Sequence, residues 1–118
     1  MSIQLPAIGA VLLLALGGCA NDPAPLEQLR LTEQAVEQAK AVGASDDSEA
    51  LKRANAKLLQ ARLDMADKSY KSARMQAEQA ELDARLAEAR VLTAKGQAQI
   101  ELQNERIKRL RKQLEQDL

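Results

Sequence analysis

Between Tyr70 and Ala98, apolar residues recur at alternating spacings of three and four without a miss. The positions are Tyr70, Ala73, Ala77, Ala80, Ala84, Ala87, Val91, Ala94 and Ala98. Residues at these spacings lie on one side of an α-helix, so the pattern predicts a long helix with an apolar stripe. Ala has a small side chain, which lets a neighbouring helix approach to about 8 Å, the short end of the usual range. The stripe therefore restricts the fold to closely packed helices.

The composition agrees with a helical fold. Tyr70 is the only aromatic residue among 118, so Ala and Leu have to fill the space that aromatic side chains usually fill in a core. Strong helix formers dominate the chain from Leu26 onward. The sequence therefore predicts a single all-α domain. The 17 basic and 17 acidic residues give a net charge of zero, which argues against nucleic acid as a partner.

Two shorter helices are expected before the stripe. The first begins near Pro25 and ends at a C-cap on Gly43. The second opens with a capping box formed by Asp46 and Glu49 and ends near Ala66, although a helix continuing through residues 67–69 is an alternative. The expected core positions of these two helices are Leu31, Ala35, Val36, Ala39, Val42, Leu51, Ala54, Leu58, Ala61 and Met65. The sequence thus predicts an antiparallel helical hairpin or three-helix bundle over residues 26–95.

The long helix carries a second apolar stripe on another face. This stripe consists of Met75, Leu82, Leu86 and Ala89. A helix with two stripes is expected to touch two partners, as the central helix of a bundle does. Asp83 lies beside this stripe and is expected to be solvated.

After Gly96 the apolar pattern changes phase, and residues 96–118 are expected to form an amphipathic helical tail. Its larger side chains, Ile100, Ile107, Leu110 and Leu114, are the candidates for binding a partner. At 1.5 Å per residue the first two helices each reach about 30 Å, so a continuous third helix is far longer than the bundle. We expect it to project as a coiled-coil-like tail rather than to fold back at Gly96. The partner is either another copy of the chain or a different helical protein of the cell envelope.

The first nineteen residues have the layout of a secretory signal. Ile8 to Leu16 form an uncharged apolar run, and every acidic or basic side chain lies after Cys19. A transmembrane helix needs about 20 apolar residues, and this run is shorter. The run is therefore expected to be a signal for secretion. One form that it can take is an ordinary cleaved signal, and the residues at its end suggest another.

The residues Leu16-Gly17-Gly18-Cys19 resemble the lipobox of bacterial lipoproteins. The resemblance implies that residues 1–18 are a lipoprotein signal peptide and that the Cys19 thiol carries the lipid. Residues 19–25 then form the lipidated cysteine and a short tether. Ala20 follows the cysteine where Asp would retain such a protein in the inner membrane, so the expected location is the periplasmic face of the outer membrane.

A longer stretch also resembles a known family. Tyr70-x-x-Ala73-x-x-x-Ala77-Glu78-Gln79-Ala80 follows the helical run Leu51 to Ala66, with the lipobox ahead of both. This arrangement is similar to that of the small bacterial lipoproteins grouped as DUF4398, a domain of unknown function. The resemblance covers nearly all of residues 26–95 and implies a lipid-anchored envelope protein, in some members beside a peptidoglycan-binding domain. The family brings no assigned function.

The residue types argue against an enzyme. The chain has no His, and its only thiol, Cys19, is assigned to the lipid. It has no Gly-rich phosphate loop, so no catalytic residue, metal ligand or cofactor is expected. The expected function is that of a non-enzymatic, lipid-anchored helical module that associates with itself or holds a helical partner in the envelope. The alternative is an accessory module that binds peptidoglycan or another ligand.

Overall fold

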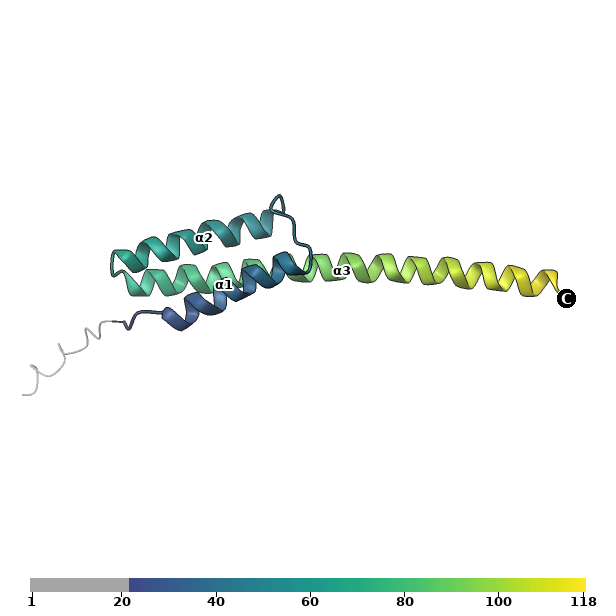
Figure 1. The fold of residues 1–118 in the computed structure, drawn as a ribbon, viewed down its shortest axis with the longest axis horizontal. Coiled ribbons are helices and arrows are strands. Elements are labelled where there is room, and N and C mark those ends of the chain that lie inside the picture. Colours follow the sequence, from purple (N-terminus) through teal and green to yellow (C-terminus); the bar gives the residue numbers. More distant parts are fainter. Residues whose placement is uncertain (1–21) are drawn as a thin grey trace, which may run out of the picture.

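The computed structural model describes residues 22–118, which form three helices and no strand in that range. The helices are α1 (Leu26–Ala41), α2 (Glu49–Ala66) and α3 (Tyr70–Gln116). They form a three-helix bundle from which the second half of α3 extends alone (Figure 1). The predicted all-α fold with a long third helix is confirmed. The predicted signal peptide and Cys19 lie outside the described residues.

Both turns of the bundle use the same backbone device. At the end of α1 the N–H of Ala44 donates to the Ala39 carbonyl and that of Gly43 to Lys40, the pattern of a Schellman C-cap. Gly43 has φ +107°, a conformation that favours glycine, so its predicted capping role is confirmed. The end of α2 repeats this pattern with Lys68 at the left-handed position, φ 60°. The helix therefore ends where a break was predicted, without a glycine.

The start of α2 corrects one prediction. The N-cap is Ser48, whose side chain accepts a hydrogen bond from the backbone N–H of Leu51. The predicted capping box on Asp46 is wrong because α2 begins at Glu49, one residue after Ser48. Asp46 lies in the preceding turn. Both Asp and Ser are good N-cap residues, and Ser48 has this role because it directly precedes the first residue of α2.

The core is built on five buried Ala side chains of α3, which we call the Ala stripe. They are Ala73, Ala77, Ala80, Ala84 and Ala87, each at most 2% exposed. Both other helices contact α3 far more than they contact each other, so this narrow stripe serves two neighbours. The turn between α2 and α3 is short, so α2 runs antiparallel to α3. Since α1 also runs antiparallel to α2, α1 is parallel to α3. Contacts from Gln28 to Glu81 and from Gln38 to Glu88 follow that parallel course.

One buried residue of α1 is polar. Thr32 is fully buried, and its hydroxyl donates to the Gln28 carbonyl at 2.8 Å within α1 or to the Ala77 carbonyl of α3 at 2.9 Å. Leu31, expected in the core, is instead 37% exposed. Thr32 takes that place because its methyl group packs while its hydroxyl is satisfied by carbonyl oxygens.

The bundle ends at Lys95. The Lys95 ammonium donates to the Val42 carbonyl at the end of α1, and Val91 packs against the core. Every residue after Lys95 is exposed, and α3 continues without a break through Gly96 to Gln116. At 1.5 Å per residue this free part is about 30 Å long. The tail therefore projects and does not fold back, as expected.

Candidate functional site

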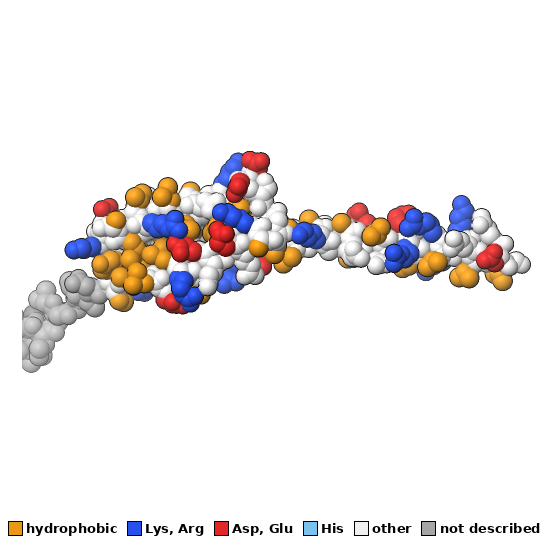
Figure 2. Space-filling model, in the orientation of Figure 1, with side chains coloured by type: hydrophobic (Ala, Val, Ile, Leu, Met, Phe, Trp, Pro, Cys, Tyr) orange, Lys and Arg blue, Asp and Glu red, His pale blue; other side chains and the backbone are white. Residues whose placement is uncertain are grey.

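The predicted partner-binding residues all lie on the projecting tail. Ile100, Ile107, Leu110 and Leu114 are between 46% and 67% exposed. Figure 2 shows such apolar side chains at the tail surface among charged ones. Exposing several large apolar side chains along one side of a helix is unfavourable in water. The tail is therefore the clearest candidate for an interaction surface in the described part of the chain.

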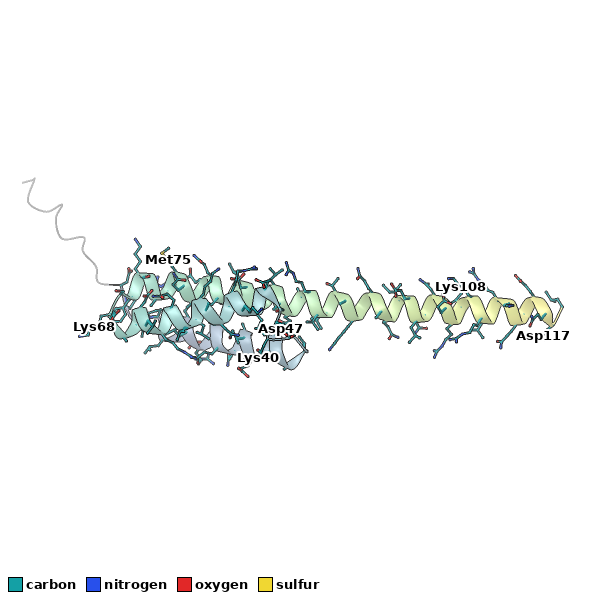
Figure 3. All side chains as sticks on the ribbon, turned by 90° about the horizontal axis from the view of Figure 1, so that it is seen from above. Lys40, Asp47, Lys68, Met75, Lys108 and Asp117 are labelled. Atoms are coloured by element: carbon teal, nitrogen blue, oxygen red, sulfur yellow. The ribbon has the colours of Figure 1, made fainter. Side chains whose placement is uncertain are left out.

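The second stripe of α3 is not packed inside the bundle. Met75, Leu82 and Leu86 are 51%, 68% and 38% exposed. Figure 3 shows Met75 pointing away from the side of α3 on which α1 and α2 lie. The expectation that each stripe would contact its own partner helix is therefore wrong. The Ala stripe accommodates both neighbours because its side chains are small, which leaves the larger stripe in solvent.

The two exposed stripes belong to a single surface. Counting by alternating threes and fours from Met75 reaches Leu82, Leu86, Ala89, Thr93, Gly96 and Ile100, and then Ile107, Leu110 and Leu114. The positions between them in this series are Gln79 and Gln103. We call this side of α3, from Met75 to Leu114, the outer face. The tail stripe changes phase only relative to the Ala stripe, and it continues the stripe that begins at Met75.

The outer face has a narrow middle. Its large apolar side chains occupy the two ends, and Ala89, Thr93 and Gly96 lie between them. A Cβ atom built on Gly96 meets nothing within 4 Å, so no contact in the bundle requires a glycine there. Small residues at this point leave room for the backbone of another helix to come close.

Asp83 lies next to the outer face but belongs to the bundle. Its carboxylate accepts hydrogen bonds from Lys57 at 2.7 Å and Arg53 at 3.2 Å, both on α2. The Asp83 side chain is 13% exposed, so the prediction of a solvated residue is wrong. Partial burial acts to raise the pKa of Asp83, but the hydrogen bonds and charges of Lys57 and Arg53 outweigh it and lower that pKa. The cluster joins α2 to α3.

This cluster predicts a dependence of stability on pH. A lowered pKa in the folded state stabilises the fold above the ordinary Asp value of about 3.9, and this stabilisation is lost as the pH falls through the folded-state value. We expect Asp83→Asn to lower the free energy of unfolding by about 1 kcal/mol at neutral pH. Urea unfolding at neutral pH and at successively lower pH values is the measurement.

The difference between the wild type and Asp83→Asn is expected to shrink as the medium becomes acidic. The control is Asp46→Asn, in the exposed turn before α2, which leaves the curve unchanged. Glu81, whose pKa is lowered by hydrogen bonds from Arg85 and Gln28, retains its share of the pH dependence in both variants. A constant difference at all pH values would contradict this role of Asp83.

Two hollows lie on the bundle surface. One is at the end where the chain enters, and it is lined by Asp22, by residues 68–72 around the start of α3, and by Met75. The other is a groove between α1 and α2 beside Val36 and Leu58. Among residues 22–118 there is no group of three or more carboxylate, His or Cys side chains placed to hold a metal ion. None of the helices in that range has both the length and the apolar character needed to cross a membrane.

The predicted lipidation site, Cys19, lies outside the described residues, so its surroundings are not part of this geometry. What the described part shows is the place where the chain reaches the bundle. Asp22 borders the same hollow as the start of α3, and the tail leaves from the opposite end at Lys95. The start of the described chain at Asp22 and the exposed tail therefore lie at opposite ends of the bundle (Figure 1).

Comparison with known proteins gives two matches. A family model described as "Domain of unknown function (DUF4398)" matches residues 27–102. The crystal structure of a DUF4398 family protein from Pseudomonas aeruginosa PAO1 is similar to this chain, with 59% sequence identity and a TM-score of 0.77. The alignment covers 81% of this chain and 100% of the other. No curated protein matches the chain.

Proposed function

The chain belongs to the DUF4398 family, and from that premise we propose that it is a non-enzymatic, lipid-anchored protein of the cell envelope that presents a helical interaction surface. The observation that carries the proposal is the position of the tail. It projects from the end of the bundle opposite to the end at which the chain enters. A lipid at Cys19 would thus hold one end of the molecule while the other end stayed free to bind.

The distance between these ends supports a role as a spacer. α3 has 47 residues, which corresponds to about 70 Å of helix. A helix of that length exceeds the thickness of a lipid bilayer, about 40–45 Å with its headgroups. The two ends of the molecule can therefore act at points that are far apart.

Residues 16–19 support the lipid anchor through their resemblance to a lipobox. Each buried CH₂ group contributes about 0.8 kcal/mol to membrane binding, and one acyl chain gives only marginal affinity. A lipoprotein cysteine carries two or three chains by that resemblance, which is enough for stable attachment. Because Ala and not Asp follows the cysteine, we propose that the anchor lies in the periplasmic face of the outer membrane.

Fractionation of cells that express single substitutions tests the anchor. We expect Cys19→Ser to move the protein from the membrane pellet to the soluble fraction or to leave it as an unprocessed precursor. We expect Ala20→Asp to keep it in the pellet but to shift it from the outer to the inner membrane in a density gradient. The measurement is an immunoblot of each fraction.

Ser45→Ala, in the exposed turn after α1, is the control and should distribute as the wild type does. If the Cys19→Ser protein remains processed and in the outer membrane, the anchor proposal is wrong. The same fractions test the alternative of a cell-wall binder. A Cys19→Ser protein that sediments with purified peptidoglycan would favour that function over the helical module.

A further inference from the structure

The outer face is long enough to form a coiled coil only when the bundle and the tail contribute together. A two-stranded coiled coil is recognised by heptads sustained over at least three to four repeats. The tail from Gly96 to Leu114 falls short of that length, whereas Met75 to Leu114 exceeds it. A partner that covered the whole face would therefore have to run along the bundle as well as the tail.

Neither α1 nor α2 covers the outer face, although Asp22, which precedes α1, lines a hollow together with Met75 at one end of it. The Ala stripe, against which α1 and α2 pack, lies on the opposite side of α3 from the outer face. Figure 3 shows Met75 and Lys40 of α1 on opposite sides of the molecule. A second helix can therefore lie along α3 for the full length of the outer face without meeting α1 or α2.

The outer face is complementary to itself when a second copy runs in the opposite direction. From this arrangement we propose that it is the dimer interface of the protein, with two copies of α3 packed antiparallel along residues 75–114. The proposal names the partner of the interaction surface and so rests on that part of the proposed function, but not on the lipid at Cys19.

The pairing follows from antiparallel heptad geometry, in which position a of one helix faces position d of the other. With the twofold axis in the narrow middle, Thr93 faces Gly96 and Ile100 faces Ala89 of the second copy. The remaining pairs are Ile107 with Leu82, Leu114 with Met75, Leu110 with Gln79, and Gln103 with Leu86. Small side chains thus meet at the centre, where the helices come closest, and in the next layer Ile100 meets the small Ala89. Farther out, two layers pair large apolar side chains with each other and two layers pair a Leu with a Gln.

The charges beside the outer face oppose a parallel pair. In a parallel coiled coil each g position meets the e position of the next heptad in the partner. That arrangement would place Arg85 against Arg90, Arg106 against Arg111 and Glu78 against Asp83. All three pairs have like charges. Because Asp83 and Arg85 already have partners of opposite charge in the bundle, the Arg106–Arg111 pair in the tail contributes most to selecting against this orientation. The antiparallel arrangement avoids all three.

The antiparallel arrangement brings together only Arg85 and Arg106 as a like-charge pair. Arg85 already forms an ion pair with Glu81 at 2.6 Å, which offsets its charge. The other flanking positions near the centre and in the tail are mostly amides, among them Gln97, Gln99 and Asn104. These side chains neither repel nor require an acidic partner, which favours a second copy over a helix of opposite charge.

Disulfide cross-linking of the full chain in membranes tests the orientation. Two differently tagged copies are co-expressed, one with Ala89→Cys and the other with Ile100→Cys, and the membranes are treated with a mild oxidant. In the proposed dimer these positions face each other, within the short Cα separation that a disulfide needs. We expect a mixed dimer when both variants are present and none with either alone.

The control pair is Ala89→Cys with Ile107→Cys, which are two core layers out of register and should give no mixed dimer. Mass spectrometry of the cross-linked peptides distinguishes links between positions 89 and 100 from links that involve Cys19. A link through Cys19 would show that this thiol is not lipidated, so failure of the lipid anchor is recognised separately from failure of the dimer. Cross-linking of Ile100→Cys with itself would overturn the antiparallel orientation. Absence of any link between positions 89 and 100 would overturn the dimer.

A second measurement does not depend on cysteine chemistry. Leu82→Lys places a charge on the outer face within the bundle, where the side chain is 68% exposed in a single copy, so the fold is not disturbed. We expect the full chain in mild detergent to sediment as a monomer after this change and as a dimer without it. Leu59→Lys, at a 58% exposed position on α2, is the matched control and should remain a dimer. A dimer that persists in Leu82→Lys would contradict the proposal.

Discussion

Replacing Leu51 with Ala is expected to lower the free energy of unfolding by about 2–5 kcal/mol. Leu51 is 0% exposed and is the largest apolar side chain that is fully buried in the described residues. Its neighbours in the core are mostly Ala, whose side chains cannot reach into the space that its removal leaves. A domain of this size has a total stability of about 5–15 kcal/mol, so the loss is a large share. Urea unfolding followed by far-ultraviolet circular dichroism measures it.

Leu59→Ala is the matched control on the same helix. Leu59 is 58% exposed, so its truncation should change the free energy of unfolding by no more than about 0.5 kcal/mol. If Leu51→Ala and Leu59→Ala have equal effects, the core is not centred where α2 meets α3. The comparison therefore tests the packing and not merely the helical content of α2.

Enlarging the Ala stripe is the second change with a large expected effect. Ala84 is 0% exposed, and a Leu side chain at this position has no space between α3 and its neighbours. Overpacking of a core costs about 1–3 kcal/mol, and more where the backbone has to move. We expect Ala84→Leu to lower the midpoint of thermal unfolding and to loosen the contact of α1 with α3, as measured by calorimetry and amide hydrogen exchange.

Ala98→Leu provides the control for Ala84→Leu. Ala98 continues the same spacing along α3 but lies beyond the bundle, where it is exposed. Leu and Ala are both good helix formers, so the substitution in the tail should have little effect on the stability of the bundle. Equal destabilisation by the two substitutions would mean that close helix packing is not what requires Ala at position 84.

The Ala stripe is the part of the fold that sequence reasoning recovers best. Its spacing specifies a helix, and its side-chain size specifies close packing, so both the start at Tyr70 and the buried positions Ala73 to Ala87 follow from local rules. The pattern continues to Ala98, however, whereas the last residue of the stripe that is even half-buried is Val91. The length of the neighbouring helices sets that limit, and the stripe itself contains no sign of it.

Tertiary context decides the points that the sequence left open or got wrong. Either of the two apolar stripes of α3 has the spacing of a face that packs against another helix. Only the structure shows that α1 and α2 both pack against the stripe with the smaller side chains, the Ala stripe. Thr32 is polar but is buried, because its hydroxyl can donate a hydrogen bond to the carbonyl oxygen of Gln28 on α1 or of Ala77 on α3. Lys68 adopts a left-handed backbone conformation, which is uncommon for residues other than glycine and cannot be predicted from the residue type. Each outcome depends on atoms that are distant in sequence or on a backbone turn.

The candidate interaction surface was identified in part. The tail residues from Ile100 to Leu114 were named from their spacing, and they are exposed as an interaction surface requires. The sequence does not predict their continuation along the bundle to Met75, because the stripe of Met75, Leu82 and Leu86 predicts packing against a helix of the same chain. The residues that link the two halves, Ala89, Thr93 and Gly96, are too small to mark an apolar stripe by themselves.

The unbroken course of α3 through Gly96 has a consequence for how chains of this kind can change in length. One residue inserted at the junction turns everything beyond it by about 100° and lengthens the rod by about 1.5 Å. Such a change would point Ile100 and Leu114 away from the line defined by Met75 and Leu82. An insertion or deletion of seven residues restores that line to within about 20°. Length variation at this junction is thus compatible with one continuous face only in steps of whole heptads.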